Sequence, residues 1–132
     1  MNIVVPLNIE SWSGALTLLT ALGIIFIGVR ELFQPSIAAS QFGVPLVEPR
    51  DNDFLAIKAS RDIASGVVVL ALFAIGDHGA VVCAMLALTL IPIFDGLVVF
   101  RHAHWVFKPA ILIHWGTAVF MLLVVQLLRM GL

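Results

Sequence analysis

Residues 56–66 read AIKASRDIASG, and the apolar run VVVLALFA follows them directly at residues 67–74. This order places Arg61 and Asp62 inside a segment that is otherwise apolar enough to lie in lipid. A charged side chain at the centre of a membrane helix costs about 2.5–3.5 kcal/mol on insertion scales. We therefore expect the other unusual polar residues of the chain to lie where they compensate for this cost.

The composition of the whole chain indicates a membrane protein. Of its 132 residues, 61% are hydrophobic and 11% are charged, whereas about 25% are charged in an ordinary soluble domain. Too few polar side chains remain to cover the surface of a water-soluble fold. The formal net charge of −1 gives no basic face for nucleic acid, so we expect no nucleic-acid partner. The length indicates a single domain over residues 1–132.

Four apolar segments approach the roughly 20 residues that a bilayer core requires. They predict membrane-spanning helices over about residues 11–34, 53–75, 79–101 and 109–129. Within the one long connection, residues 36–42 form either a short surface helix or a plain loop. Pro92 should kink the third helix just before Asp95. The predicted fold is an all-α, integral membrane, antiparallel four-helix bundle.

The distribution of Lys and Arg predicts the orientation in the membrane. Basic residues flank the first and third connections but not the second: Arg30, Arg50, Lys58 and Arg61 at the first, Arg101 and Lys108 at the third. By the positive-inside rule these two connections face the cytoplasm. The predicted localisation is a multi-pass integral membrane protein with both termini on the non-cytoplasmic side.

The ionisable residues of the predicted spans fall in one half of the bilayer. At about 1.5 Å rise per residue, Arg61 and Asp62 lie about 12 Å from the cytoplasmic start of their helix. Asp95 and His114 lie about 9 Å and about 8 Å from the corresponding ends of theirs. Because polar groups in membrane helices face inward and pair there, we expect one buried cluster. Its predicted members are Arg30, Glu31, Arg61, Asp62, Asp95 and His114.

This cluster has two interpretations. In the structural one, Arg61 forms salt bridges with Asp95 or Glu31 that fix helix register and leave no room for a ligand. In the functional one, the cluster lines a cavity in which Asp95 or Asp62 and His114 donate and accept protons. No sequence motif for a cofactor or a metal is present, so we expect neither.

Several motifs of the chain resemble those of a known family. They are GVRE at residues 28–31, KASRDIASG at 58–66, IPIFDG at 91–96, and His114 in the last predicted span. Together, in this order and spacing, they are similar to the small four-helix integral membrane proteins grouped as DUF4267, to which no function is assigned. The resemblance implies a family polar signature at Arg30, Arg61, Asp62, Asp95 and His114.

We interpret the chain as a small membrane-embedded enzyme that performs cofactor-free acid–base chemistry, of isomerase or cyclase type, on a lipophilic small molecule. The candidate catalytic residues are Asp95, His114, Asp62, Arg61, Glu31 and Arg30. Its expected partners are that molecule and membrane lipids. Two alternatives stay open: a non-catalytic accessory or scaffold subunit, and a homo-oligomeric proton-coupled transporter or channel.

Overall fold

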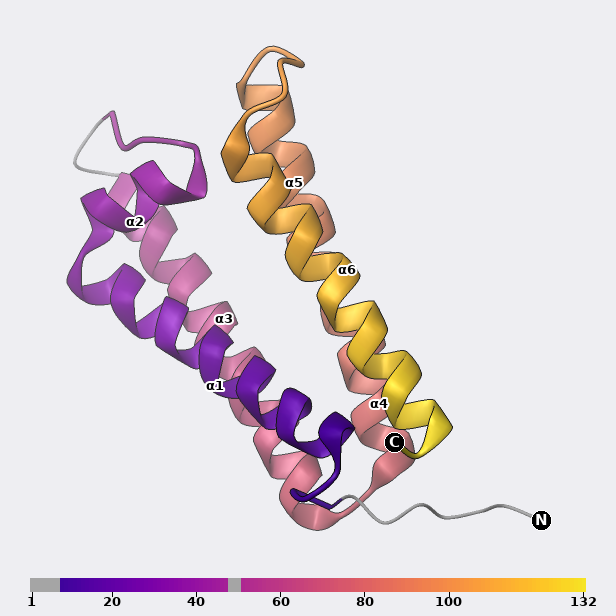
Figure 1. Ribbon diagram of the computed structural model, residues 1–132. Helices are drawn as coiled ribbons and strands as arrows, with labels where there is room; N and C mark the ends of the chain where they lie inside the picture. Colours follow the sequence, from indigo (N-terminus) through magenta and orange to yellow (C-terminus); the bar gives the residue numbers. More distant parts are fainter. Residues whose placement is uncertain (1–7, 48–50) are drawn as a thin grey trace.

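The computed structural model describes residues 8–47 and 51–132, and these residues form an all-α structure (Figure 1). The helices are α1 (Trp12–Phe33), α2 (Pro35–Phe42), α3 (Asp51–Ile75), α4 (His78–Leu88), α5 (Leu90–His102) and α6 (Pro109–Met130). The connection over residues 36–42, for which the sequence left two alternatives, is therefore a helix. The helix predicted to start at residue 53 starts earlier, at Asp51.

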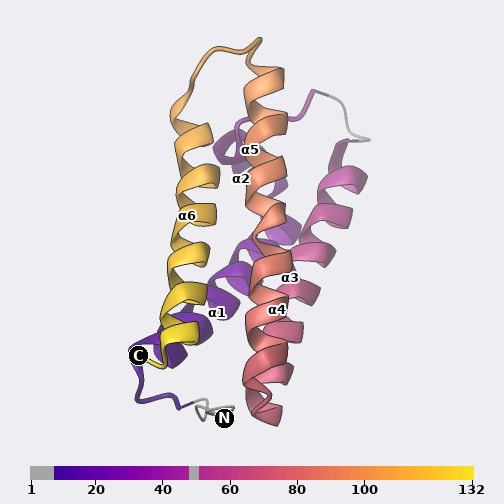
Figure 2. The same ribbon diagram turned by 90° about the vertical axis from the view of Figure 1, so that its right-hand side faces the viewer.

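The long helices form two antiparallel pairs. One pair is α1 with α3. The other is α6 with the rod made by α4 and α5, which follow each other nearly in line (Figure 2). The pairs converge at the end of the molecule where the C-terminus lies, and they diverge at the other end, where α2 lies (Figure 1).

Two glycines allow α1 and α3 to pack backbone against backbone. A Cβ atom at Gly28 of α1 would lie 2.7 Å from the carbonyl oxygen of Ala59, and one at Gly66 of α3 would lie 2.5 Å from that of Ala21. Ala21 and Ala59 are fully buried. Small residues are the usual means of such close approach in lipid, where helix association depends on van der Waals packing.

The third predicted helix is interrupted at Thr89, one turn before Pro92. Proline has no N–H, so it cannot bond the carbonyl of the residue four positions earlier, and it disturbs the turn that precedes it. The Ile93 N–H lies 3.5 Å from the Thr89 carbonyl, and the Thr89 hydroxyl donates to the Met85 carbonyl at 2.7 Å. The sequence predicted a kink at Pro92, just before Asp95. The structure places the interruption at Thr89, three residues earlier, because a proline disturbs the helical turn that precedes it.

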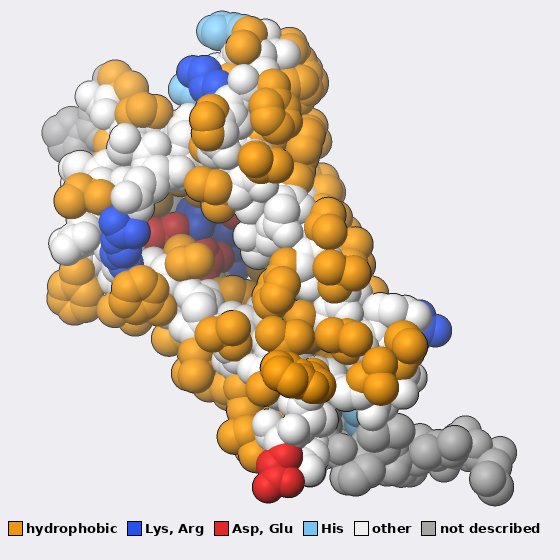
Figure 3. All heavy atoms as spheres, in the orientation of Figure 1, with side chains coloured by type: hydrophobic (Ala, Val, Ile, Leu, Met, Phe, Trp, Pro, Cys, Tyr) orange, Lys and Arg blue, Asp and Glu red, His pale blue; other side chains and the backbone are white. Residues whose placement is uncertain are grey.

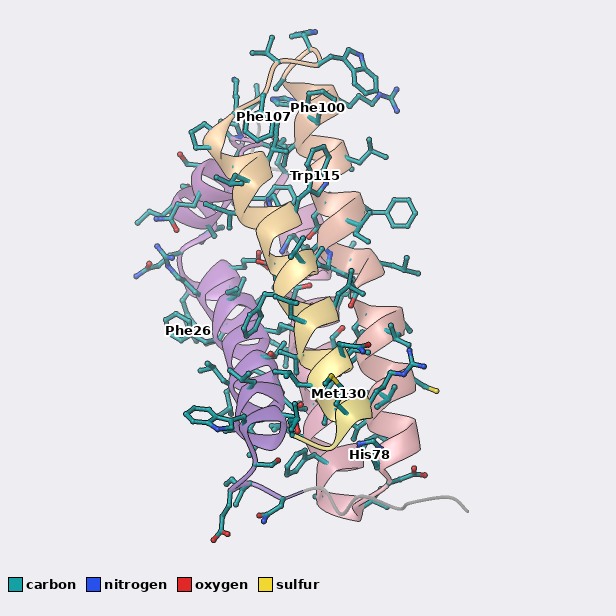
Figure 4. All side chains as sticks on the ribbon, turned by 45° about the vertical axis from the view of Figure 1, so that its right-hand side comes forward. Phe26, His78, Phe100, Phe107, Trp115 and Met130 are labelled. Carbon is teal, nitrogen blue, oxygen red and sulfur yellow. The ribbon has the colours of Figure 1, made fainter. Side chains whose placement is uncertain are left out.

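Three stretches are long and apolar enough to cross a membrane: Trp12–Phe33, His78–His102 and Pro109–Met130. The 25-residue α3 is also long enough, but it carries Lys58, Arg61 and Asp62 within its apolar run. Large apolar side chains such as Phe26 and Met130 point outward (Figure 4) and are 67% and 60% exposed. Such a surface is suited to lipid, and the structure is consistent with an integral membrane protein.

An apolar core fills the converging end of the molecule. Its fully buried members include Val69, Val81, Met85, Met121 and Val124. Because the helices diverge beyond this core, the other end is not filled in the same way.

Candidate functional site

A cavity of about 610 Å³ lies between the two helix pairs at the diverging end. Each of the six helices contributes to its wall, and α2 contributes Ala38, Ser40, Gln41 and Phe42. Figure 3 shows the hollow between the pairs, with basic and acidic side chains inside it. The ionisable side chains that line it are Arg30, Glu31, Lys58, Asp62, Asp95 and His114.

A row of alternating charges crosses the site from α1 through α3 to α5. The Lys58 ammonium lies 2.5 Å from Glu31 and 2.6 Å from Asp62. The Arg61 guanidinium lies 3.1 Å from Asp62 and 3.2 Å from Asp95. Lys58 and Asp62 are four residues apart and so share a face of α3, while Arg61 extends from the adjacent face toward α5.

Most of this row is buried. The exposed fractions of the side chains are 4% for Glu31, 8% for Asp62, 11% for Lys58 and 14% for Asp95, whereas Arg61 is 41% exposed. Buried charges are stable only when they are paired and hydrogen-bonded. The row supplies this pairing, but it contains three carboxylates and two cations, so it has one cation too few.

The carboxylate of Glu31 is only partly hydrogen-bonded. Its Oε1 accepts from Lys58, but its buried Oε2 has no hydrogen-bond partner within residues 8–47 and 51–132. A buried acceptor without a donor costs about 1–3 kcal/mol, and more when it is charged. This oxygen has almost no accessible surface, so it lies within the wall of the cavity and not at its surface.

His114 faces the same cavity and is held by α2. Its Nε2 lies 3.0 Å from the carbonyl oxygen of Phe42, and the two rings meet edge to face at 4.6 Å. A carbonyl oxygen only accepts, so Nε2 donates in this bond. His114 is therefore a cavity-lining side chain whose position is fixed by its bond to α2.

Phe42 connects the histidine to the charged row. The Lys58 ammonium lies 5.0 Å from the centre of the Phe42 ring, within the range of a cation–π contact. The Phe42 side chain thus touches Lys58 and His114, which lie on different helix pairs. The next residue, Gly43, fits against Val99 and Ala110 with φ of +101°, where a Cβ atom would be both strained and crowded.

The six predicted site residues lie close together in the structure, but they do not all line the cavity. Arg30, Glu31, Asp62, Asp95 and His114 line the cavity, and Arg61 lies behind it, paired with Asp62 and Asp95. The side chain of Arg30 forms no ion pair with any described residue. His114 bonds a backbone carbonyl, not a carboxylate. The predicted Arg61–Asp95 salt bridge is present, and a cavity is present beside it.

Two contributors were not predicted as site residues. Lys58 is the centre of the row, and its position four residues before Asp62 was a usable signal in the sequence. Phe42 lies in the short connecting helix, and nothing local indicated that it would reach α6. Among the described residues, no group of three or more His, Cys, Asp or Glu side chains is placed to hold a metal ion.

The fold and the site together describe a small all-α protein with helices long and apolar enough to cross a membrane, arranged around a charged cavity. The chain belongs to the DUF4267 family, described as a domain of unknown function, whose model matches residues 21–128. This match confirms the resemblance noted in the sequence. Comparison with curated proteins and with solved structures gave no match.

Proposed function

We propose that this protein is a four-span integral membrane enzyme that binds a lipophilic small molecule in the cavity and performs cofactor-free acid–base chemistry on it. The observation that carries the proposal is the cavity itself. It combines apolar walls, a buried row of charges, and a histidine that lines the cavity beside them.

Helix α3 is the fourth span in this proposal. Its charged residues Lys58, Arg61 and Asp62 would exclude it from lipid if they were unpaired. Glu31 of α1 and Asp95 of α5 supply the counter-charges. The basic residues Arg101 and Lys108 between α5 and α6 favour a cytoplasmic location for the diverging end, with both termini on the other side. Arg50, also counted for this orientation, lies outside the described residues.

The cavity suits an amphipathic molecule. Ile24 and Ile27 of α1 and Ile113 of α6 give it an apolar wall, and the ionic row gives it a polar end. A cavity of this size and mixed character is typical of small-molecule sites. The polar group of such a ligand would lie against the ionic row, and its apolar part against the isoleucine side chains.

His114 is the candidate base. Its Nδ1 would remove a proton from one atom of the ligand and return it to another, so that the proton balance closes without a cofactor. Arg30 has no carboxylate partner among the described residues and lines the same cavity, so it is available to stabilise the negative charge that develops when the proton leaves. Asp62 is held between two cations and has an electrostatic function in this scheme, while Asp95 orients Arg61.

An exchange experiment tests this chemistry without knowledge of the substrate. The purified full chain in lipid nanodiscs is incubated in D₂O with a membrane lipid extract, and lipophilic compounds that gain deuterium are sought by mass spectrometry. The wild-type protein should label at least one compound, and His114→Gln should lose this activity by about 100-fold or more, the usual contribution of a general base.

His78 provides a matched control. Its Nε2 lies 2.9 Å from the Leu128 carbonyl oxygen. His78 is thus hydrogen-bonded to a backbone carbonyl as His114 is, but it lies at the far end of the molecule. His78→Gln should retain labelling. Equal labelling by His114→Gln and wild type would refute the base assignment. A retained lipophilic compound without any labelling would support a binding protein.

The channel alternative receives less support. A conducting path needs polar groups along its length, but the converging end is filled by Val69, Met85, Met121 and Val124. The scaffold alternative requires only the ion pairs, and it leaves the cavity without an explanation.

A further inference from the structure

The end of α5 and the connection to α6 form a basic and aromatic tip that the proposed chemistry does not use. The tip comprises residues 101–108, of which 103–108 connect the two helices, and it projects beyond α2 at the diverging end (Figure 1). Figure 3 shows basic and histidine side chains gathered there. Its exposed members are Arg101, His102, His104, Trp105, Val106, Phe107 and Lys108.

No described acidic side chain pairs with the positive charges of the tip. From Gly96 to Leu132 the sequence contains no Asp or Glu residue. Arg101 and Lys108 form no ion pair with any residue that the structure describes. Asp95 itself is already bonded to Arg61. Within residues 8–47 and 51–132, the tip therefore carries positive charge without an acidic partner.

The tip carries a surface hollow that is lined by Val98, Arg101, His102 and His104. A guanidinium carries five N–H donors in a planar fork that matches phosphate geometry, and an imidazole carries at least one N–H in either neutral tautomer. Three of the four residues that line the hollow therefore carry hydrogen-bond donors, and Val98 is its apolar member.

The backbone of the tip is held in an unusual conformation. His104 and Trp105 have positive φ values of 54° and 64°, a region that residues other than glycine rarely occupy. Their N–H groups bond the carbonyls of Arg101 and Phe100 at 3.0 Å each, and the Trp105 ring meets the Phe100 ring edge to face at 5.2 Å. Sparsely populated conformations of this kind concentrate at ligand sites.

We propose that this hollow binds the phosphate of an anionic phospholipid headgroup. Arg101 would bond the phosphate oxygens with its fork, and His102 and His104 would each donate one further hydrogen bond. Trp105, which is 63% exposed, would lie at headgroup level beside the bound lipid, where indole rings are enriched. The inference depends on the membrane location of the chain and not on the chemistry at His114.

Lipid preference tests the proposal. The full chain is titrated in detergent with phosphatidylglycerol or phosphatidylcholine, and bound lipid is counted by native mass spectrometry. A basic residue near an anionic surface contributes about 1 kcal/mol, or about fivefold in affinity. The wild type should prefer phosphatidylglycerol by at least this factor, and the double variant Arg101→Gln, His104→Gln should lose most of the preference.

Arg129 serves as the matched control, because it is an exposed arginine at the opposite end of the molecule. Arg129→Gln should keep the preference, and raised salt should weaken it in the wild type. Equal binding of the two lipids by the wild type, or equal losses in the Arg101 and Arg129 variants, would overturn the proposal. So would displacement of the lipid by inorganic phosphate at similar concentrations, which would indicate a site for free phosphate.

Discussion

Lys58 is the residue on which the buried charges depend. It lies between Glu31 and Asp62 at hydrogen-bond distance from both and is 11% exposed. Neither carboxylate has a comparably buried cation as an alternative in the described part of the chain. Removal of the ammonium would leave Glu31 without its described partner and Asp62 with Arg61 only.

Lys58→Met should therefore lower the free energy of unfolding by about 3–5 kcal/mol, as is usual when one partner of a buried ion pair is removed. Reversible denaturation in detergent measures this change. Lys108→Met, at an exposed site without an ion pair to any described residue, is the control and should change stability little. A Lys58→Met protein as stable as the wild type would contradict the dependence of the buried carboxylates on Lys58.

At the scale of single helices, the contact between α1 and α3 depends on where glycine lies. A Cβ atom at Gly28 would meet the backbone of Ala59, but one at Gly23 on the same helix would have no neighbouring atom of the described residues within 4 Å. The two glycines differ in packing and are alike in helical conformation, so a pair of substitutions separates these effects.

Gly28→Ala should destabilise the protein by about 1–3 kcal/mol through overpacking, whereas Gly23→Ala should be neutral or stabilise it by up to about 1 kcal/mol through helix propensity. Thermal unfolding midpoints in detergent measure both. Similar midpoints for the two variants would mean that α1 and α3 are not in close contact in the membrane.

Gly43, directly after α2, packs against Val99 and Ala110. This contact between the end of α2 and the other helix pair is also testable. Gly43 and Gly76 both have positive φ, +101° and +79°, but of the two only Gly43 faces side chains of described residues. Gly76→Ala should cost about 1–2 kcal/mol from backbone strain alone. Gly43→Ala should cost about 1–3 kcal/mol more, because a methyl group there meets Val99 and Ala110.

Denaturation of both glycine variants in detergent gives the comparison. Equal losses of stability would contradict the described docking of α2. A larger loss for Gly43→Ala would support it, and the same protein should then retain less lipophilic compound, because α2 forms part of the cavity wall.

At the scale of the whole molecule, the divergence of the two helix pairs creates the site. Contacts between the pairs concentrate at the converging end. At the other end the pairs are joined by the Arg61–Asp95 bridge and by the Phe42–His114 contact. The ionic row and α2 therefore hold the cavity at a fixed width.

The proposed topology places the two ends of the molecule on opposite sides of the membrane. In a Cys83→Ala background, His104→Cys should react with a membrane-impermeant thiol reagent only from the cytoplasmic side, and Met130→Cys only from the other side. The physical reason is the excess of Lys and Arg at the diverging end. Reaction of both cysteines from one side would refute the four-span topology.

The sequence determined the local features of this protein. The apolar segments predicted the all-α structure, and the charges within apolar segments predicted a shared cluster. These inferences succeed because helix periodicity and the cost of unpaired charge in an apolar setting act over a few residues. The six predicted site residues do lie together.

The tertiary structure decided which of these groups pair, and whether a cavity remains between them. Glu31 and Lys58 are 27 residues apart in sequence, and Phe42 and His114 are 72 apart. Such pairs depend on the angle between the helix pairs and on the docking of α2, which are set by packing between distant segments. No local pattern encodes that angle, so the pairing of Lys58 with Glu31 and the position of Phe42 beside His114 became visible only in the fold.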